Sequence, residues 1–399
     1  MNKLTVEDLE LQGRRVLMRV DFNVPLQDGR VADDGRIRAA LPTIRHILEK
    51  KGKLVLMSHL GRPKGSRVPE MSLQPCTDVL DDLLQAETAF APDCVGEEAE
   101  AASQRLAEGQ LLLLENLRFH AGETENAPEF AGQLARVGDV YVNDAFGTAH
   151  RAHASTEGVT RHFKQCAAGF LMMKEIEFLG RVVEKPEKPY VAVLGGAKIS
   201  GKIDVISNLL PKVDRILIGG GMMYTFFKAR GLEIGNSLLE ADRVEMAANI
   251  LEEAGEKIVL PEDCVVSDHF DFKNRQVGEL QTLSAGVIPA DAYGLDIGEG
   301  TVERFRSELQ DAQTVAWNGP MGVFEIDATA KGTFAIARIL AEITEKGAIT
   351  VVGGGDSAAA VRKAGVQDRV SHVSTGGGAS LEFMEGKTLP GIAALTDKP

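Results

Sequence analysis

Glycine-rich turns in the second half of the chain are the segments best suited to hold a phosphate group. They follow β-branched runs and lie at Gly195-Gly196, Gly219-Gly220-Gly221, Gly353-Gly354-Gly355 and Gly376-Gly377-Gly378. Glycine lets backbone N–H groups approach a ligand closely, and a turn that opens a helix adds the positive end of the helix dipole. Four such turns in one half of the chain predict a nucleotide site. Asp356 could cap a helix that starts at Ser357, or hold Mg²⁺ beside nucleotide phosphates.

Two lysines stand four residues apart just after the first glycine pair. Gly196 to Lys202 has the spacing G-x-x-x-x-G-K of a phosphate-binding loop. The next residue is Ile203, however, and not the Ser or Thr whose hydroxyl such a loop places on Mg²⁺. The segment is therefore a near match only. Lys198 and Lys202 could still reach a phosphate, and the alternative is that both are solvated lysines on a helix face.

Arginines gather in the first half of the chain, beside predicted strand ends. They are Arg36, Arg62, Arg118 and Arg151. Arginine binds phosphate and carboxylate groups with two parallel hydrogen bonds, so four converging arginines would form an anion pocket. Any one of them could equally be a surface residue, and His59 could be structural. Asp21 and Asn23 follow a strand on one face and suit the recognition of a hydroxyl group.

An alternation of strands and helices must position these side chains. Strand-like runs cover residues 15–23, 53–59, 110–119 and 140–146, and then 190–194, 215–219, 314–317, 349–352 and 370–374. Helix-like segments cover residues 37–51, 77–85 and 130–137, and then 203–210, 243–254, 302–309 and 334–345. Apolar strands alternating with helices predict βαβ units with parallel sheets, whose ligands bind outside the carboxyl ends of the strands. The fold class is therefore α/β, with two doubly wound, Rossmann-like domains.

A boundary is visible near the middle of the chain. A continuous helical pattern covers residues 170–184, and two prolines follow in Lys185-Pro186-Glu187-Lys188-Pro189. Prolines end a helix and stiffen a connector, so we expect a hinge helix and linker at residues 171–188. The N-terminal domain would then cover residues 1–170 and the C-terminal domain residues 189–386. An ordinary helix end within one domain is the alternative.

Charge and composition exclude several classes of protein. The net charge is −14 over 399 residues, which argues against a nucleic-acid partner. The four cysteines, Cys76, Cys94, Cys166 and Cys264, form no C-x-x-C pair, so the sequence supports no zinc or redox motif. No run approaches ~18 apolar residues, so no membrane span is expected. The cytoplasm is the expected compartment.

Seven motifs in order resemble those of the phosphoglycerate kinase family, over about residues 15–390. They are Arg19-Val20-Asp21-Phe22-Asn23-Val24-Pro25, Ser58-His59-Leu60-Gly61-Arg62-Pro63, Asn143-Asp144-Ala145-Phe146-Gly147, Gly195-Gly196-Ala197-Lys198, Trp317-Asn318-Gly319-Pro320, Gly353-Gly354-Gly355-Asp356 and Thr375-Gly376-Gly377-Gly378-Ala379. The chain departs from the family at Tyr293, where the loop before Gly294 lacks the usual Trp-Met, and at Glu299, where Pro is usual.

The resemblance implies phosphoryl transfer from 1,3-bisphosphoglycerate to ADP with Mg²⁺, giving 3-phosphoglycerate and ATP in glycolysis. The implied residues for 3-phosphoglycerate are Asp21, Asn23, Arg36, His59, Leu60, Gly61, Arg62, Arg118 and Arg151. Those for the nucleotide are Lys202, Gly294, Glu325 (on the ribose), Gly354, Gly355, Asp356 (also on Mg²⁺) and Ser357. The catalytic set is Arg36, Lys198, Lys202, Gly376, Gly377 and Gly378. The family is also monomeric, closes about a hinge and packs its last residues, here about 387–399, on the N-terminal domain.

The implied chemistry needs no general base, because an attacking carboxylate is already ionised near pH 7. That agrees with the lack of a recognisable Ser-His-Asp or Cys-His arrangement in the sequence. Three alternatives remain. A P-loop ATPase is disfavoured by Ile203, and a dinucleotide-dependent dehydrogenase by the lack of any G-x-G-x-x-G motif. A non-catalytic binding module is disfavoured by the complete set of candidate cationic residues.

Overall fold

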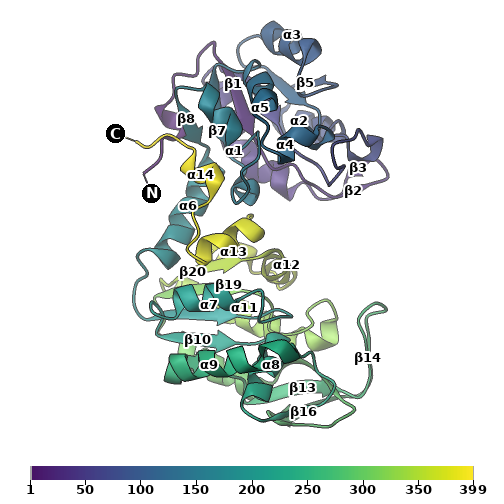
Figure 1. Cartoon of the computed structure of the whole chain (residues 1–399), viewed down its shortest axis with the longest axis vertical. Coiled ribbons are helices and arrows are strands. Elements are labelled where there is room, and N and C mark those ends of the chain that lie inside the picture. Colours follow the sequence, from purple (N-terminus) through teal and green to yellow (C-terminus); the bar gives the residue numbers. More distant parts are fainter. Residues whose placement is uncertain (1, 399) are drawn as a thin grey trace. The chain divides into compact units, whose positions relative to one another are not determined.

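The chain divides into two compact α/β units in a computed structural model that describes residues 2–398 (Figure 1). Unit 1 comprises residues 2–177 and 388–398, and unit 2 comprises Phe178–Lys387. Helix α6 (Phe170–Val183) crosses from unit 1 into unit 2. The described residues contain no helix with both the length and the apolar character needed to span a bilayer.

Unit 1 is built on a parallel sheet of six strands, and the direction of winding reverses between two of them. In sheet order the strands are β5 (Thr88–Ala91), β6 (Leu111–Leu114), β4 (Lys53–Met57), β1 (Arg15–Arg19), β7 (Val140–Asn143) and β8 (Cys166–Ala168). The helices are α1 (Gly35–Glu49), α2 (Pro75–Leu84), α3 (Glu97–Arg105), α4 (Ala121–Thr124), α5 (Pro128–Ala135) and α14 (Pro390–Ala393), and β2 (Leu26–Gln27) pairs with β3 (Arg30–Val31). Starting from β1, the chain first adds β4, β5 and β6 on one side of this strand, and later adds β7 and β8 on its other side. Ligands of such sheets bind at this reversal, outside the carboxyl ends of the strands.

Strand β1 shows how the core positions the candidate site. Val16 and Met18 point to one face and pack with Ile37 and Ile44 of α1 in the core of unit 1. Arg19, the next residue along the strand, therefore points to the opposite face, because side chains alternate along a strand. The strand ends at Arg19, so Asp21 and Asn23 lie in the loop that follows it and not in the strand predicted over residues 15–23.

Unit 2 repeats the plan with a second six-stranded parallel sheet. In sheet order its strands are β12 (Ile258–Val259), β10 (Arg215–Ile218), β9 (Tyr190–Leu194), β19 (Thr314–Asn318), β20 (Ile349–Gly353) and β21 (His372–Val373). The helices are α7 (Ile203–Leu209), α8 (Met222–Ala229), α9 (Val244–Ala254), α10 (Glu299–Leu309), α11 (Lys331–Glu345), α12 (Gly355–Lys363) and α13 (Gly378–Met384). Numbered along the chain, these strands have the order 3-2-1-4-5-6 of a Rossmann sheet. The winding reverses between β9 and β19.

An antiparallel sheet also belongs to unit 2, and the sequence analysis did not predict it. Its strands are β16 (Leu280–Ser284), β13 (Asp263–Ser267) and β18 (Tyr293–Ile297). The short pairs β11 (Glu233–Ile234) with β17 (Val287–Ile288) and β14 (Phe270–Asp271) with β15 (Gln276–Val277) are also present. The β14–β15 hairpin projects from the rest of unit 2 (Figure 1).

The predicted α/β class with two parallel sheets is confirmed, and most differences lie at element ends. Strand β9 occupies the predicted residues 190–194. Helix α7 begins at the predicted residue 203 and ends at Leu209, one residue earlier than predicted. The strand predicted over residues 110–119 was too long, because β6 ends at Leu114 and a 3₁₀ turn, η3 (Leu117–Phe119), follows. Strand β21 covers only His372–Val373 of the predicted residues 370–374.

The last described residues pack on unit 1. The backbone N–H of Leu4 donates to Thr396 O at 2.8 Å, and that of Gly391 donates to Ala149 O at 2.8 Å. Lys3 forms an ion pair with Asp397 at 2.8 Å. A side chain at Gly391 would meet the backbone of Ala149, so this close approach requires glycine.

Asp296 is expected to make the stability of unit 2 depend on pH. It is buried in β18, where a carboxyl oxygen accepts the N–H of Gly332 in the first turn of α11 at 2.7 Å, and burial raises its pKa to about 8. The folded pKa lies above the unfolded value of ~3.9, so unit 2 should lose stability as pH rises from about 4 through 8. Asp296→Asn removes this titration, and the variant should therefore lose less stability than wild type between pH 5 and 8.

The sole tryptophan of the chain, Trp317, is buried in unit 2, so its fluorescence during urea unfolding reports the transition of this unit. Parallel pH dependences in the wild type and the Asn variant would contradict this prediction.

Candidate active site

Four arginines of unit 1 lie close enough to two buried histidines for their charges to act on them. Burial is the main cause that lowers the pKa of His59 well below its ordinary value, and the charges of Arg19, Arg118 and Arg36 lower it further. Burial likewise lowers the pKa of His153 to about 4, with help from Arg118, Arg19 and Arg151. Both imidazoles are therefore neutral near pH 7. We call these six residues the cationic cluster: Arg19, Arg36, Arg118, Arg151, His59 and His153.

Two arginines of the cluster have well-defined contacts at the reversal point of the sheet. Arg36, in the first turn of α1, forms an ion pair with Asp21 and keeps 41% of its side chain exposed. Arg118 lies in η3, and its Nη1 donates to Gly61 O at 2.8 Å. Burial is the largest cause that lowers the Arg118 pKa to about 10, and repulsion from Arg19 adds to it. Its Nε is buried and has no hydrogen-bond partner among the described residues. An anion placed here would therefore relieve repulsion between cations and satisfy a buried donor.

The loop after β4 is held by two asparagines. The N–H of Leu60 donates to Asn116 Oδ1 at 3.2 Å, and the N–H of Gly61 donates to Asn23 Oδ1 at 2.9 Å. These two amides are therefore already used within the protein. The guanidinium of Arg62, which follows them, is exposed. Arg151 is exposed as well, and its Nε donates to His150 Nε2 at 3.2 Å.

A buried chain of hydrogen bonds, which links Arg19 to Glu123 through Ser155, was missed by the sequence analysis. Arg19 is fully buried, and its Nε donates to Ser155 Oγ at 2.8 Å. Ser155 Oγ in turn donates to Glu123 Oε1 at 2.6 Å, and the Ser155 N–H donates to Oε2 of the same carboxylate at 2.9 Å. Glu123 is also fully buried, so the charges of Arg19 and Glu123 compensate each other. The one available signal was an arginine within the apolar run at residues 16–20.

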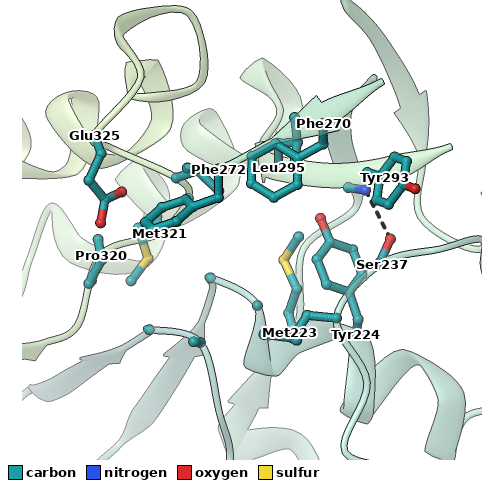
Figure 2. Close-up of a pocket in the computed structure, with 18 of the residues that line it drawn as sticks. Met223, Tyr224, Ser237, Phe270, Phe272, Tyr293, Leu295, Pro320, Met321 and Glu325 are labelled. Atoms are coloured by element: carbon teal, nitrogen blue, oxygen red, sulfur yellow. Dashed lines mark hydrogen bonds between the residues drawn. The ribbon is translucent and has the colours of Figure 1, made fainter. Parts of the chain in front are cut away.

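An apolar cavity of about 410 Å³ lies in unit 2, lined largely by apolar and aromatic side chains (Figure 2). The labelled lining residues are Met223, Tyr224, Ser237, Phe270, Phe272, Tyr293, Leu295, Pro320, Met321 and Glu325. Three residues predicted for the nucleotide, Gly294, Glu325 and Asp356, also line this cavity. The N–H of Gly294 donates to Ser237 Oγ at 2.9 Å, which fixes this part of the wall. An apolar cavity with a few polar groups at its rim is typical of a small-molecule site.

The aromatic residues of this cavity were also missed. The Phe270 ring lies 6.3 Å from that of Phe272 and 6.1 Å from that of Tyr293, measured between centroids. Phe272 remains 56% exposed at the cavity. Of these aromatic residues, the sequence analysis had named only Tyr293, next to the predicted Gly294, and no motif marked the hairpin that carries Phe270.

The remaining predicted site residues of unit 2 do not line the cavity: the two lysines follow β9, Gly354, Gly355 and Ser357 follow β20, and the Gly376-Gly377-Gly378 turn follows β21. Lys202 Nζ donates to Asn318 Oδ1, and Ser357 Oγ accepts the N–H of Gly319 at 2.6 Å. Burial lowers the pKa of Lys202 to about 8, while the charges of Asp356 and Glu385 act in the opposite direction. Lys198 is exposed before α7, so neither lysine stands on a helix face.

Helix α12 begins two residues earlier than predicted, at Gly355 and not at Ser357. Gly354 occupies the N-cap position with φ +92°, which favours glycine. Asp356 is therefore not the cap. It is exposed in the first turn of the helix and so remains available to a ligand.

The glycine clusters serve two different purposes. A Cβ at Gly195 would collide with Pro320 O, and one at Gly220 would lie 2.5 Å from Gly196 N. These glycines allow the ends of neighbouring strands to approach each other closely. In contrast, a Cβ at Gly355 or Gly377 would meet nothing within 4 Å. The N–H of Gly376 donates to Ser374 Oγ at 3.1 Å, and Gly378 begins α13.

Two α/β units, one with a cluster of arginines and the other with an apolar cavity beside a carboxylate, are the arrangement expected of a two-domain kinase. A family model described as phosphoglycerate kinase matches residues 6–387. The chain is 57% identical to a phosphoglycerate kinase of Chloroherpeton thalassium and 56% identical to one of Chlorobaculum tepidum, each over the full length of both chains. Its fold matches the solved phosphoglycerate kinase of Coxiella burnetii with a TM-score of 0.88 at 40% identity, and that of Pyrococcus horikoshii with 0.84 at 34%, covering 98% of each chain. The chain belongs to the phosphoglycerate kinase family.

Proposed function

We propose that the cationic cluster of unit 1 binds 3-phosphoglycerate and that the cavity of unit 2 binds the adenine nucleotide. The reaction is that of a phosphoglycerate kinase, a glycolytic phosphotransferase with a carboxyl acceptor. It moves a phosphoryl group reversibly between 1,3-bisphosphoglycerate and ADP, giving 3-phosphoglycerate and ATP. One observation carries the assignment of the acid site: the charges of four arginines act on two neutral histidines, and the buried Nε of Arg118 has no hydrogen-bond partner among the described residues.

The proposed acid site combines cations with hydroxyl recognition. Arg118 and the exposed Arg62 and Arg151 supply charge for the phosphate and carboxylate groups. Asp21 is assigned to the substrate hydroxyl. Asn23 can contact the substrate only through its amide nitrogen, because its Oδ1 already accepts the N–H of Gly61. The remaining assigned residues are His59, Leu60, Gly61 and Arg36. Because the amides of Leu60 and Gly61 are already bonded, these two residues shape the site and leave direct anion binding to the arginines.

The proposed nucleotide site places the base against the apolar walls of the cavity, beside Gly294. Glu325 would accept hydrogen bonds from the ribose hydroxyls. Gly354 and Gly355, at the start of α12, would face the phosphates, where the N-terminus of a helix favours negative charge. Ser357 is assigned a positioning role, because its buried hydroxyl holds Gly319.

Mg²⁺ is proposed to bind with the nucleotide, and Asp356 fits it. Its carboxylate is a hard oxygen ligand, exposed at the start of a helix and at the edge of the cavity. The ion would neutralise charge on the nucleotide phosphates. Lys202 lies close enough to Asp356 for the two charges to interact.

Transfer itself is proposed to rest on positioning and charge stabilisation. Arg36 and Lys202 are assigned to the equatorial oxygens of the moving phosphoryl group, and Lys198 to the charge of the transferring or the substrate phosphate. The backbone N–H groups of the Gly376-Gly377-Gly378 turn are assigned as a clamp. Gly377 and Gly378 carry this role, because the N–H of Gly376 is bonded to Ser374.

The pH dependence of kcat/KM should report Lys202. Its pKa of about 8 means that the cationic form is lost as pH rises through 8, so kcat/KM for MgATP should fall above that pH. Lys202→Arg keeps its charge at all accessible pH values and should shift the fall to higher pH. Initial rates from pH 6.5 to 9.5 test this prediction, with circular dichroism to verify folding. Identical profiles for the two proteins would contradict it.

The finer biological setting is also part of the proposal: a monomer in the cytoplasm that acts on small metabolites, without a nucleic-acid or membrane partner. The two ligands are assigned to different units, so transfer requires them to meet. Closure about the predicted hinge at residues 171–188 stays a prediction. Small-angle scattering with both ligands should show compaction, and an unchanged radius would argue against closure.

The reverse reaction and a binding footprint test the proposed function together. ADP formation from MgATP should require 3-phosphoglycerate, whereas a P-loop ATPase would release ADP without it. Hydrogen exchange should slow around η3 and the loop after β4 with 3-phosphoglycerate, and around β18 and α12 with MgADP. Protection of the wrong unit by either ligand would overturn the site assignment even if the enzyme were active.

A further inference from the structure

A thiol, an imidazole and a carboxylate meet in unit 1 at a place that the reaction does not use. Asp93 and Cys94 lie in the loop between β5 and α3, and His120 lies between η3 and α4. One ligand atom from each residue, including Cys94 Sγ, lies within 4.8 Å of the other two. None of the three residues belongs to the cationic cluster. The sequence had given no metal motif because Cys94 and His120 are 26 positions apart.

The three groups are already oriented by their surroundings. His120 Nε2 contacts Asp93 Oδ1 at 2.7 Å, and the Phe130 ring stacks on the imidazole with centroids 5.1 Å apart. Asp93 Oδ1 also accepts the N–H of Cys94 at 2.6 Å, so the backbone holds the carboxylate. The stacked ring and the backbone N–H are contacts behind the ligands, which are a regular part of metal sites in proteins, whereas the 2.7 Å contact joins two of the proposed ligands.

Access to the site comes from one side. Cys94 is fully buried, whereas the side chains of Asp93 and His120 keep 39% and 33% of their surface exposed. An ion could therefore enter between the carboxylate and the imidazole and meet the thiol behind them.

We propose that Asp93, Cys94 and His120 form a Zn²⁺ site with one water as the fourth ligand. Sulfur, imidazole nitrogen and carboxylate oxygen are the ligands that Zn²⁺ takes, at ~2.3, ~2.0 and ~2.0 Å. Tetrahedral geometry then requires ligand atoms roughly 3.3–3.6 Å apart, so the His120–Asp93 contact opens slightly and the thiol moves inward. On binding, the Cys94 thiol gives its proton to solvent and forms a Zn–S bond, and the His120 ring changes tautomer, so that the proton moves from Nε2 to Nδ1 and leaves Nε2 to bind the ion. The thiolate and the Asp93 carboxylate then balance the two positive charges.

One acidic and one basic side chain lie near the proposed site, and their opposite charges suit a dication that its own thiolate and carboxylate ligands neutralise. The buried carboxylate of Glu123 acts on Cys94 and favours a cation. The guanidinium of Arg67, which donates to Pro92 O, opposes it. Mg²⁺ is not expected, because it prefers an octahedron of hard oxygen ligands.

The test uses the full chain, treated with a chelator and free of nucleotide. Calorimetric titration with Zn²⁺ and native mass spectrometry should show one ion per chain at this site. Co²⁺, used as a spectroscopic probe, should give a thiolate-to-cobalt charge-transfer band. His120→Gln, Asp93→Asn and Cys94→Ser should each weaken Zn²⁺ binding at least ~10-fold, and Cys94→Ser should abolish the cobalt band. Cys76→Ser, which alters another fully buried thiol, should change neither.

The exposed ligands keep the test decisive even if Cys94→Ser fails to fold. Undiminished Zn²⁺ affinity in both His120→Gln and Asp93→Asn would overturn the proposal. A cobalt charge-transfer band that persists in folded Cys94→Ser, or the absence of Zn²⁺ binding by the wild-type chain, would overturn it as well.

Discussion

Replacing Arg36 with alanine is expected to lower kcat by about 10²–10³-fold while leaving the fold intact. Arg36 is assigned to the oxygens of the phosphoryl group in transfer, and the loss of one preorganised charge of this kind costs about that factor. The side chain is 41% exposed and its partner is Asp21, so its removal leaves no cavity in the core. Exposed ion pairs contribute about 0–1 kcal/mol to stability. Steady-state kinetics at saturating substrates measures the loss.

Arg38 provides a matched control on the same helix. It lies two residues further along α1, is 59% exposed and also pairs with an aspartate, Asp34, at 2.8 Å. Arg38→Ala changes the net charge by the same amount and should keep kcat within about twofold of the wild type, because surface substitutions away from a site have small effects. Equal losses in both variants would show a general charge effect, and near-normal turnover of Arg36→Ala would end its catalytic assignment.

Replacing Arg19 with leucine is expected to destabilise unit 1 by about 3–5 kcal/mol. Arg19 and Glu123 are both fully buried and are linked through Ser155. Removal of one partner leaves the other as an uncompensated buried charge, which typically costs this much. Hydrogen exchange of the β1 and β4 amides, measured without ligands, reports the loss in unit 1.

Two further variants separate lost charge compensation from lost packing. Arg15→Leu, also in β1, removes a partly exposed pair with Asp139 and should cost about 1 kcal/mol or less. The double variant Arg19→Leu with Glu123→Gln should recover part of the stability, because no unpaired charge remains buried. A double variant that is less stable by the full sum of the single changes would contradict the charge explanation.

Much of the scaffold could be predicted because its signals are local. Strand β9 is a buried apolar run bounded by Pro189 and Gly195, and both of its ends follow from those residues. The antiparallel sheet was missed for the opposite reason. Strand β16 is polar and mostly exposed, so its pattern gives no core face, and its pairing with β13 depends on contacts distant in the sequence.

The candidate sites could be predicted only where a motif carries the chemistry. Arg62 and the glycine turns stand in recognisable motifs beside strand ends, whereas Arg36, Arg118 and Arg151 lie outside those motifs and were assigned through the family resemblance. The chain of hydrogen bonds from Arg19 through Ser155 to Glu123 joins residues up to 136 positions apart, and no local sequence pattern predicts it. Glycine is also ambiguous as a signal. Gly195 and Gly220 serve close backbone packing, whereas Gly355 leaves open space for a ligand, and the sequence looks alike in both cases.

Formation of ATP from ADP and 1,3-bisphosphoglycerate, followed together with 3-phosphoglycerate, tests the central claim most directly. One ATP should form for each 3-phosphoglycerate, the reaction should depend on Mg²⁺, and its rate should fall about 10²–10³-fold in Arg36→Ala but not in Arg38→Ala. Release of 3-phosphoglycerate and inorganic phosphate without ATP, or ATP formation at the same rate in all three proteins, would contradict it.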